Sequence, residues 1–273
     1  MSSDKKIGQS EISSTVKAFL IDLDGVLYVG KNPIPGVREC LQQMQDLGYG
    51  YRFVSNSTRR CRSSVADRLR GLGYDVAASQ IFTPPLAAIE HMKRHGKDRC
   101  YLLTTGDVNK DFENAGIEIC QDQADYIVVG DAADGFTFER LNLALRQIMD
   151  GAEILALEKD RYWMEPGGLV LSAGPFVAAL EYASGKKAEL MGKPSSQFFK
   201  MALDDLGIRP EDAAMIGDDI KTDVHGAAEM GMKGILVKTG KYREDLAKSY
   251  SPPPYMVLES MAGLAEHLWR RKS

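Results

Sequence analysis

The sequence predicts an α/β fold in which a largely parallel sheet carries an inserted second α/β domain. Apolar strand-like runs alternate with helical patterns along almost all of the 273 residues, as they do in parallel α/β proteins. The alternation restarts after Pro84-Pro85 as if for a separate unit, and a chain of this length is long enough for two cores. We therefore expect one core built from residues 16–85 and 187–273, with an inserted domain at 86–186.

Periodicity places the elements of the first core segment. The buried run from Ala18 to Leu23 predicts a strand, and apolar residues at helical spacing from Val37 to Leu47 predict a helix that Gly48 ends. A second strand is expected at 51–54, and Val65, Leu69 and Leu72 mark the next helix.

The inserted domain and the second core segment continue the alternation. In the insertion we expect helices at 86–94, 138–148 and from Gly174-Pro175 through Leu180, and strands at 100–103, 126–129 and 154–157. After Gly185 we expect strands at 189–191, 213–216, 235–237 and 256–258, with helices at 198–206, around Ala227-Ala228 and at 264–269.

Composition excludes several classes of protein. An apolar content of 44% with 26% charged residues is typical of globular proteins. The net charge of −4 and the absence of long basic runs argue against a nucleic-acid surface. We find no signal peptide and no apolar run long enough to cross a membrane. The four cysteines, Cys40, Cys61, Cys100 and Cys120, stand far apart, which favours reduced thiols and a cytoplasmic protein.

An acidic motif follows the first predicted strand. Asp22 and Asp24 stand just before Gly25, at the carboxyl end of a strand, where open α/β sheets bind ligands. Two adjacent carboxylates repel each other, and a divalent cation removes that conflict. A simple turn is an alternative, since Asp and Gly are turn formers. An EF-hand loop is excluded, because its twelfth position requires glutamate and holds Pro33 here.

Three further motifs follow core strands. They are Ser55-Asn56-Ser57, Gly192-Lys193-Pro194, and Gly217-Asp218-Asp219 with Asp223. A hydroxyl before a helix offers an anion cradle, although Ser57 or Thr58 also suits a helix cap. Lysine is usually a surface charge, and acids at a helix start often serve as caps. Because such an alternative would have to hold at every one of these strand ends, a shared functional site is the better interpretation.

Taken together in this order, the motifs resemble those of haloacid dehalogenase (HAD) superfamily phosphatases, from Val16 to about Ala262. The resemblance is to the NagD-like and 4-nitrophenylphosphatase group with a class IIA α/β cap. Two more segments, Gly174–Val177 and Lys238–Arg243, look most like the branch of the phospholysine phosphohistidine inorganic pyrophosphate phosphatase. The resemblance implies a Rossmann-like core at 16–85 and 187–273 and a substrate-selecting cap at 86–186.

The resemblance also implies a role for each motif residue. Asp22 would attack phosphorus and become an aspartyl-phosphate, and Asp24 would protonate the leaving oxygen and then activate water. Ser55, Asn56 and Lys193 would bind the phosphate, and Lys193 would also act in catalysis by neutralising the charge of the nucleophile and the phosphate. Magnesium would be held by Asp22, the backbone carbonyl of Asp24, and Asp218, with Asp223 and, less strongly, Asp219 beside it.

The expected activity is therefore magnesium-dependent hydrolysis of a small phosphorylated substrate. Related ATPases carry Thr where this chain has Asp24, so hydrolysis is favoured over preservation of the phosphoenzyme. Two alternatives stay open, a HAD-type phosphotransferase or phosphomutase and a non-catalytic phospholigand-binding protein. The segment Arg161-Tyr162-Trp163 suits either a substrate-facing loop or an aromatic packing corner. Arg59 and Arg60 suit either a second phosphate or a solvated surface. Cap-mediated homodimers occur in the resembled family.

Overall fold

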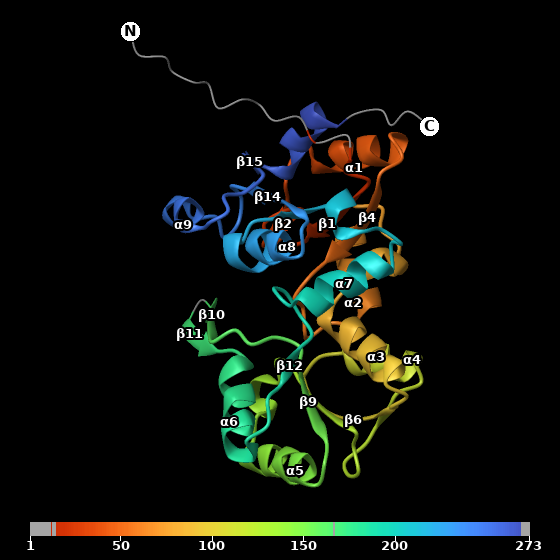
Figure 1. The fold of residues 1–273 in the computed structure, drawn as a ribbon, viewed down its shortest axis with the longest axis vertical. Helices are drawn as coiled ribbons and strands as arrows, with labels where there is room; N and C mark the ends of the chain where they lie inside the picture. Colours follow the sequence, from red (N-terminus) through yellow and green to blue (C-terminus); the bar gives the residue numbers. More distant parts are fainter. Residues whose placement is uncertain (1–11, 13–14, 166, 269–273) are drawn as a thin grey trace. The chain divides into compact units, whose positions relative to one another are not determined.

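The computed structural model describes residues 12, 15–165 and 167–268, and the chain divides into two compact units (Figure 1). The first unit comprises the described residues of Met1–Arg52 and Leu203–Ser273, and the second comprises those of Phe53–Ala202. The chain passes from the first unit to the second within strand β4 (Gly50–Val54). It returns to the first unit within helix α7 (Ser196–Asp204).

A parallel sheet joins both ends of the chain in the first unit. It is a six-stranded sheet, and its strands lie in the order β15 (Met256–Leu258), β14 (Lys233–Val237), β13 (Ala213–Gly217), β1 (Ala18–Asp22), β4 and β5 (Ile81–Phe82). Ile21 pairs with Ile216, and Ile216 pairs with Ile235. Every residue of β1 and β13 is buried, which explains their continuous apolar sequences. The α/β fold with parallel sheets is thereby confirmed.

Short helices and one hairpin complete the first unit. They are the hairpin β2 (Tyr28–Val29) and β3 (Asn32–Pro33), α1 (Val37–Asp46), η3 (Pro210–Asp212), the π-helix η4 (Ile220–His225), α8 (Gly226–Glu229), α9 (Glu244–Ser249) and the 3₁₀ helix η5 (Met261–His267). Helix α1 packs against η5, so segments from opposite ends of the chain lie side by side (Figure 1).

The second unit holds a separate parallel sheet. Its five strands lie in the order β12 (Glu189–Leu190), β9 (Glu153–Ala156), β8 (Tyr126–Val129), β6 (Arg99–Leu103) and β7 (Glu118–Ile119). Strand β5 (Ile81–Phe82) pairs with the end of β4. The remaining elements are α2 (Arg62–Gly71), η1 (Ala78–Gln80), α3 (Pro84–Arg94), α4 (Asn109–Asn114), η2 (Ala133–Gly135), α5 (Phe138–Met149), the hairpin of β10 (Tyr162–Glu165) and β11 (Gly168–Leu171), and α6 (Gly174–Ser184).

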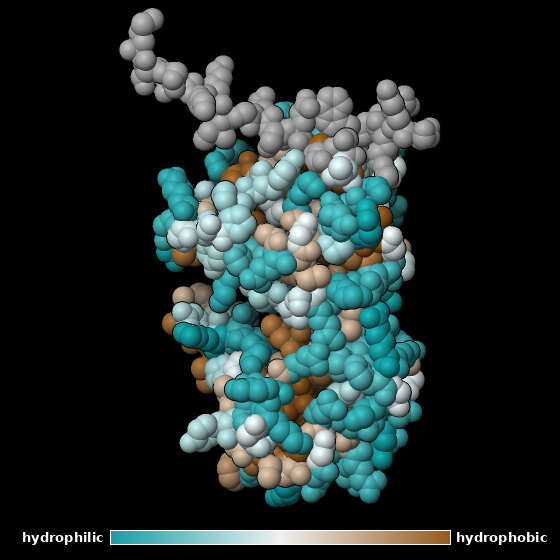
Figure 2. Space-filling view, viewed as in Figure 1, coloured by the Kyte–Doolittle hydropathy of each residue, from teal (hydrophilic) through white to brown (hydrophobic). Residues whose placement is uncertain are grey.

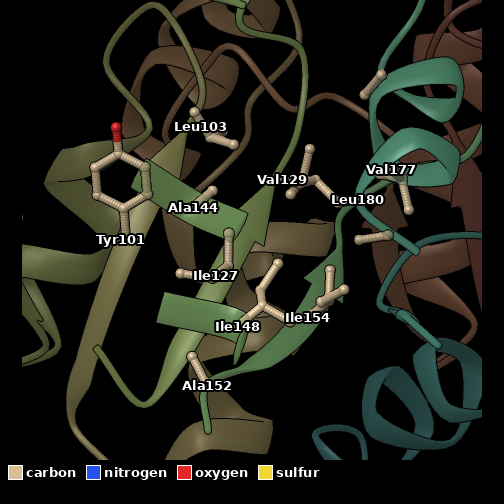
Figure 3. Packing of buried hydrophobic residues seen from close by; sticks show 12 residues of the cluster. Tyr101, Leu103, Ile127, Val129, Ala144, Ile148, Ala152, Ile154, Val177 and Leu180 are labelled. Atoms are coloured by element: carbon tan, nitrogen blue, oxygen red, sulfur yellow. The ribbon is translucent and has the colours of Figure 1, made fainter. Parts of the chain in front are cut away.

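Helices α5 and α6 close one face of this sheet. Figure 3 shows Ile127 and Ile154 of the sheet together with Ile148 of α5 and Val177 of α6 in one apolar cluster. Alternate residues of β8 contribute to this face, as the period of a strand requires. Tyr126, one position away, instead contacts the ring of His91 on α3, with ring centroids 5.6 Å apart. Apolar side chains on both faces therefore bury the sheet.

The structure corrects three expectations from the sequence. The segment after Arg161, expected as a loop, is an antiparallel hairpin. Its two strands pair from Tyr162 opposite Leu171 to Glu165 opposite Gly168, and the aromatic and β-branched residues in them favour strands. The helix expected at 264–269 is the 3₁₀ helix η5, in which the Gly263 N–H donates to the Ser260 carbonyl three residues earlier. Trp269 lies outside the described residues. The strand expected at 189–191 among the core strands is β12, which pairs with β9 in the sheet of the second unit. The helix expected around Ala227 is present as α8 and follows a π-helical turn.

The surface agrees with the composition. Polar residues cover most of the face seen in Figure 2, and all four cysteines are buried and free. Among the described residues, no helix is both long and apolar enough to cross a membrane.

Replacing Ile127 by alanine tests the core of the second unit. Ile127 is fully buried in the cluster between the sheet and α5, so Ile127→Ala should lower the free energy of unfolding by about 2–5 kcal/mol. Leu169→Ala is the control, because Leu169 is 64% exposed and its truncation should change stability by no more than about 0.5 kcal/mol. Urea unfolding measures both, and equal stabilities would contradict the packing described.

Candidate active site

Three buried carboxylates meet in the first unit. Asp22, Asp218 and Asp223 each offer an oxygen, and these oxygens lie within 4.8 Å of one another. The three residues are only 8%, 3% and 1% exposed, respectively. Negative charges brought together out of water are costly unless a positive charge accompanies them. This cluster is therefore an attractive site for a cation.

Parallel strand ends bring the first two carboxylates together. Asp22 is the last residue of β1, and Asp218 directly follows β13. Because Ile21 pairs with Ile216 in the parallel register, both strands end at the same edge of the sheet. This convergence is what the motifs at the strand ends predicted.

The π-helical turn η4 supplies the third carboxylate. Asp219 caps its start by accepting from the N–H groups of Lys221 and Thr222 at 2.9 and 3.1 Å. Oδ2 of Asp223 accepts from the Asp219 N–H at 3.2 Å. A Cβ at Gly217 would lie 2.3 Å from Cβ of Asp223, so only glycine permits this approach. Asp219 thus shapes the turn, while Asp223 faces the cluster.

A tight turn after β1 separates Asp24 from the cluster. The Gly25 N–H donates to the Tyr28 carbonyl at 2.7 Å, and Gly25 has a φ of +82°. A Cβ at Gly25 would lie 2.0 Å from Oδ2 of Asp218. Asp24 itself is exposed, and its side chain is not a member of the buried group. Asp22 and Asp24 therefore have different environments, as different chemical roles require.

The segment after β14 also contacts the cluster, and it was not among the candidate site residues. The Thr239 hydroxyl donates to the Gly25 carbonyl, and the Lys241 N–H donates to Oδ2 of Asp218 at 2.6 Å. A Cβ at Gly240 would lie 2.0 Å from the same oxygen. The signal was present in the sequence, since Thr-Gly-Lys follows a strand that ends at the same edge of the sheet.

Lys241 lies in a strongly negative environment. Burial by itself lowers the pKa of the Lys241 ammonium, but nearby carboxylates outweigh this effect and raise the pKa above its ordinary value. The carboxylates, in decreasing order of effect, belong to Asp218, Asp219, Asp22 and Asp223. Lys241 is therefore positively charged at neutral pH.

The other candidate residues gather in the second unit. Lys193 is buried, at 5% exposure. Its N–H donates to Oδ1 of Asn56 at 2.8 Å, and Nδ2 of Asn56 donates to the Lys193 carbonyl at 2.9 Å. The paired bonds join segments 137 residues apart. The Ser57 N–H donates to Oγ of Ser55 at 3.2 Å, which shapes the loop after β4.

An open pocket of about 460 Å³ lies near that loop in the second unit, lined by Arg59, Arg60, Ser64, Gly106 and Asp107. Arg59 forms an ion pair with Asp131 at 2.7 Å, and its guanidinium lies 5.4 Å from the centre of the Trp163 ring. Arg60 is exposed at the pocket. The alternative that Arg59 and Arg60 are both solvated surface residues is therefore wrong for Arg59, because Asp131 balances its charge.

The buried cluster fits magnesium. Its three side chains offer only carboxylate oxygens, which are the ligands that this hard cation prefers. Gly25 and Gly240 leave no room beside Asp218 for any side chain, and this crowding fixes the orientation of the carboxylate.

Comparison with known proteins assigns the family. The model of haloacid dehalogenase-like hydrolases matches residues 19–118, and a HAD-hydrolase-like model matches residues 190–264. Haloacid dehalogenase-like hydrolase domain-containing protein 2 from Homo sapiens is 41% identical over 253 residues, covering 93% of this chain and 96% of that protein. The phospholysine phosphohistidine inorganic pyrophosphate phosphatase of Danio rerio is 38% identical, covering 85% and 87%.

Solved structures of similar fold support the same family assignment. A p-nitrophenyl phosphatase from Archaeoglobus fulgidus superposes with a TM-score of 0.86 at 30% identity, covering 93% of this chain and 99% of that one. A 4-nitrophenylphosphatase from Thermotoga maritima gives a TM-score of 0.85 at 29% identity, covering 93% and 97%. The fold and the acidic cluster thus define a hydrolase with a Rossmann-like sheet. The chain belongs to the haloacid dehalogenase-like hydrolases, in the class that includes these nitrophenylphosphatases.

Gly25 and Gly30 provide a matched pair for testing the cluster. Both have positive φ, but a Cβ at Gly30 would have open space. Each change to alanine should cost about 1–2 kcal/mol of stability through backbone strain. Only Gly25→Ala also displaces Asp218, so we expect it alone to weaken Mg²⁺ binding by about tenfold or more. Isothermal titration calorimetry measures this difference, and equal affinities would argue against a cation held by Asp218.

Proposed function

We propose that this protein is a magnesium-dependent phosphatase that hydrolyses a small phosphorylated substrate through an aspartyl-phosphate on Asp22. The observation that carries the proposal is the group of three buried carboxylates at the end of β1 and β13. The chain also belongs to a family whose named relatives include phosphatases, which supports the same reaction.

In the first half-reaction, an oxygen of Asp22 attacks phosphorus, and the bond from phosphorus to the leaving oxygen breaks. Asp24 gives its proton to that oxygen as a general acid. In the second half-reaction, Asp24 accepts a proton from water, whose oxygen attacks phosphorus. The bond between Asp22 and phosphorus then breaks and phosphate is released. The covalent intermediate divides one difficult displacement into two easier ones.

Electrostatic repulsion is the main obstacle to this attack. Two unit negative charges 4 Å apart repel by about 4 kcal/mol at an effective dielectric constant of 20, and a phosphate dianion doubles this cost. Magnesium, when bound, supplies the positive charge that offsets much of this repulsion. Asp22, the backbone carbonyl of Asp24, and Asp218 would hold the ion, with Asp223 and Asp219 beside it.

We propose that Ser55, Asn56 and Lys193 bind the phosphoryl oxygens. The support is that Asn56 binds the backbone of Lys193 on both sides, so the lysine is held in a fixed position. A buried ammonium with a fixed backbone stabilises developing negative charge without reorganisation.

We propose residues 16–85 and 187–273 as the catalytic core and residues 86–186 as the cap that selects the substrate and excludes water. Four strands of the five-stranded sheet lie between Arg99 and Ala156 and support an inserted domain, while the fifth, β12, lies just beyond the proposed boundary at Glu189–Leu190. The buried, free cysteines support a cytoplasmic protein.

A screen of phosphorylated metabolites tests the function. Purified protein with Mg²⁺ is offered sugar phosphates, pyridoxal phosphate, phosphoglycolate, nucleotides, pyrophosphate, phospholysine and phosphohistidine, and phosphate release is measured. The last three classes are included because a 38% identical relative is named for such substrates. Transfer of the phosphoryl group to another acceptor without free phosphate would favour the phosphotransferase alternative. Tight binding without turnover would favour the non-catalytic one.

Replacement of the nucleophile gives a direct prediction. Asp22→Asn removes the attacking carboxylate while keeping its shape, so turnover should fall by at least about 10³-fold. Asp75→Asn is the control, since Asp75 is exposed and belongs to none of the motifs. Circular dichroism should show both variants folded. More than a trace of phosphatase activity in Asp22→Asn would rule out this nucleophile.

Removal of the metal gives a second prediction. A chelator should abolish activity, because the repulsion between Asp22 and the substrate then lacks its counter-charge. Excess Mg²⁺ should restore the full rate within the same sample. A rate that the chelator leaves unchanged would remove magnesium from the mechanism.

A further inference from the structure

A fully buried hydroxyl without a partner lies beside the loop that follows β4. Thr83 has no exposed surface, and none of the described residues forms a hydrogen bond with its Oγ1. A buried polar group that lacks a hydrogen bond destabilises the folded chain, whereas valine would fill nearly the same space without this cost. The hydroxyl of Thr83 therefore lowers the stability of the fold.

A helix-capping role does not account for this hydroxyl. Thr83 stands at the N-cap of α3, where a threonine side chain commonly accepts a hydrogen bond from the second or third N–H of the helix. Its side chain makes no such bond, and the first two helical residues, Pro84 and Pro85, have no N–H to donate. Only the backbone carbonyl of Thr83 serves the helix, by accepting from the Ala87 N–H at 3.1 Å.

Strand pairing brings Thr83 beside Ser55. Val54 of β4 pairs with Phe82 of β5 in parallel register. The Ser55 N–H donates to the Phe82 carbonyl at 3.3 Å, which is the bond that a parallel ladder makes when Ser55 lies opposite Thr83. The two side chains therefore share one face of the sheet. Neighbouring strands are about 4.8 Å apart, so rotation about χ1 can bring the two hydroxyls within hydrogen-bond distance.

The other proposed phosphate ligands adjoin the same place. A Cβ at Gly192 would lie 3.0 Å from Oδ1 of Asn56 and 3.1 Å from Cγ of Pro84. The residue after Thr83 thus packs against the segment that carries Lys193, which Asn56 holds by two hydrogen bonds. Thr83 is therefore flanked on both sides by residues in contact with the proposed phosphate site.

We propose that Thr83 is a positioning residue of the phosphate site and acts through Ser55. Oγ of Ser55 already accepts from the Ser57 N–H at 3.2 Å, and a hydroxyl oxygen can accept one more hydrogen bond while it donates its own proton. When phosphate binds, the Thr83 hydroxyl donates to Oγ of Ser55, and the Ser55 hydroxyl donates to a phosphoryl oxygen. Hydrogen bonds in such a chain polarise and strengthen one another. This role rests on the phosphatase function proposed above.

Two substitutions separate the hydroxyl from the rest of the side chain. Thr83→Val removes the hydroxyl and nearly keeps the shape, so it should melt at the wild-type temperature or above, because no hydrogen bond is lost. Thr83→Ser keeps the hydroxyl. Thr137→Val is the matched control, since the Thr137 hydroxyl caps α5 by accepting from the Arg140 N–H at 3.3 Å. Loss of this cap should lower the melting temperature.

Isothermal titration of the full chain with inorganic phosphate, in saturating Mg²⁺, tests the proposal. We expect Thr83→Val to bind phosphate about fivefold more weakly than the wild type, which is the usual effect of one lost hydrogen bond. Thr83→Ser should bind within about twofold of the wild type, because its hydroxyl can make the same bond. Thr137→Val should leave the phosphate affinity unchanged despite its lower melting temperature.

Equal phosphate affinities of Thr83→Val and the wild type would overturn the role of Thr83 and leave the proposed function intact. A loss of affinity that Thr83→Ser shares in full would do the same. Melting of Thr83→Val well below the wild type would also contradict the proposal, because the hydroxyl would then have a stabilising partner in the fold. If the wild type itself bound no phosphate in the presence of Mg²⁺, the proposed function would fail, and this inference with it.

Discussion

The mutual repulsion of three buried carboxylates is the constraint on which this structure depends. Asp22, Asp218 and Asp223 come from a strand end, a loop and a π-helical turn, and their oxygens share one small volume. Such an arrangement persists only where positive charge is available. The backbone N–H of Lys241 donates to one of these carboxylates, Asp218, and the cluster has the ligands to hold a divalent ion.

Close packing of backbone makes this concentration of charge sterically feasible. Gly25 and Gly240 both approach Oδ2 of Asp218, and Gly217 approaches Asp223, at distances that exclude a Cβ. Three loops at one sheet edge can therefore converge where larger residues would separate them. The chemistry of the site is thus controlled by residues that have no side chain as much as by the acids themselves.

The sequence was sufficient for the fold class and for most of the element positions. Buried parallel strands such as β1 and β13 are continuous apolar runs, and their pattern is local information. The sequence was less informative where an element depends on contacts with other segments of the chain. The hairpin β10–β11 and the π-helical turn η4 are stabilised by pairing and by the contact of Asp223 with Asp219, which no periodicity reveals.

For the candidate site, the sequence by itself determined which residue types follow the core strands, because the carboxyl ends of parallel strands share one edge. Asp22 and Asp218 follow neighbouring strands of one sheet and do meet. Lys193 instead follows β12, which belongs to the other sheet, and the roles of Asp24, Ser55 and Lys193 stay predictions. Only the tertiary structure decided which atoms approach one another. It placed Asp223 among the buried carboxylates, joined Asn56 to Lys193, and brought Lys241 to Asp218. Such contacts between distant segments depend on packing distances, which a linear pattern does not contain.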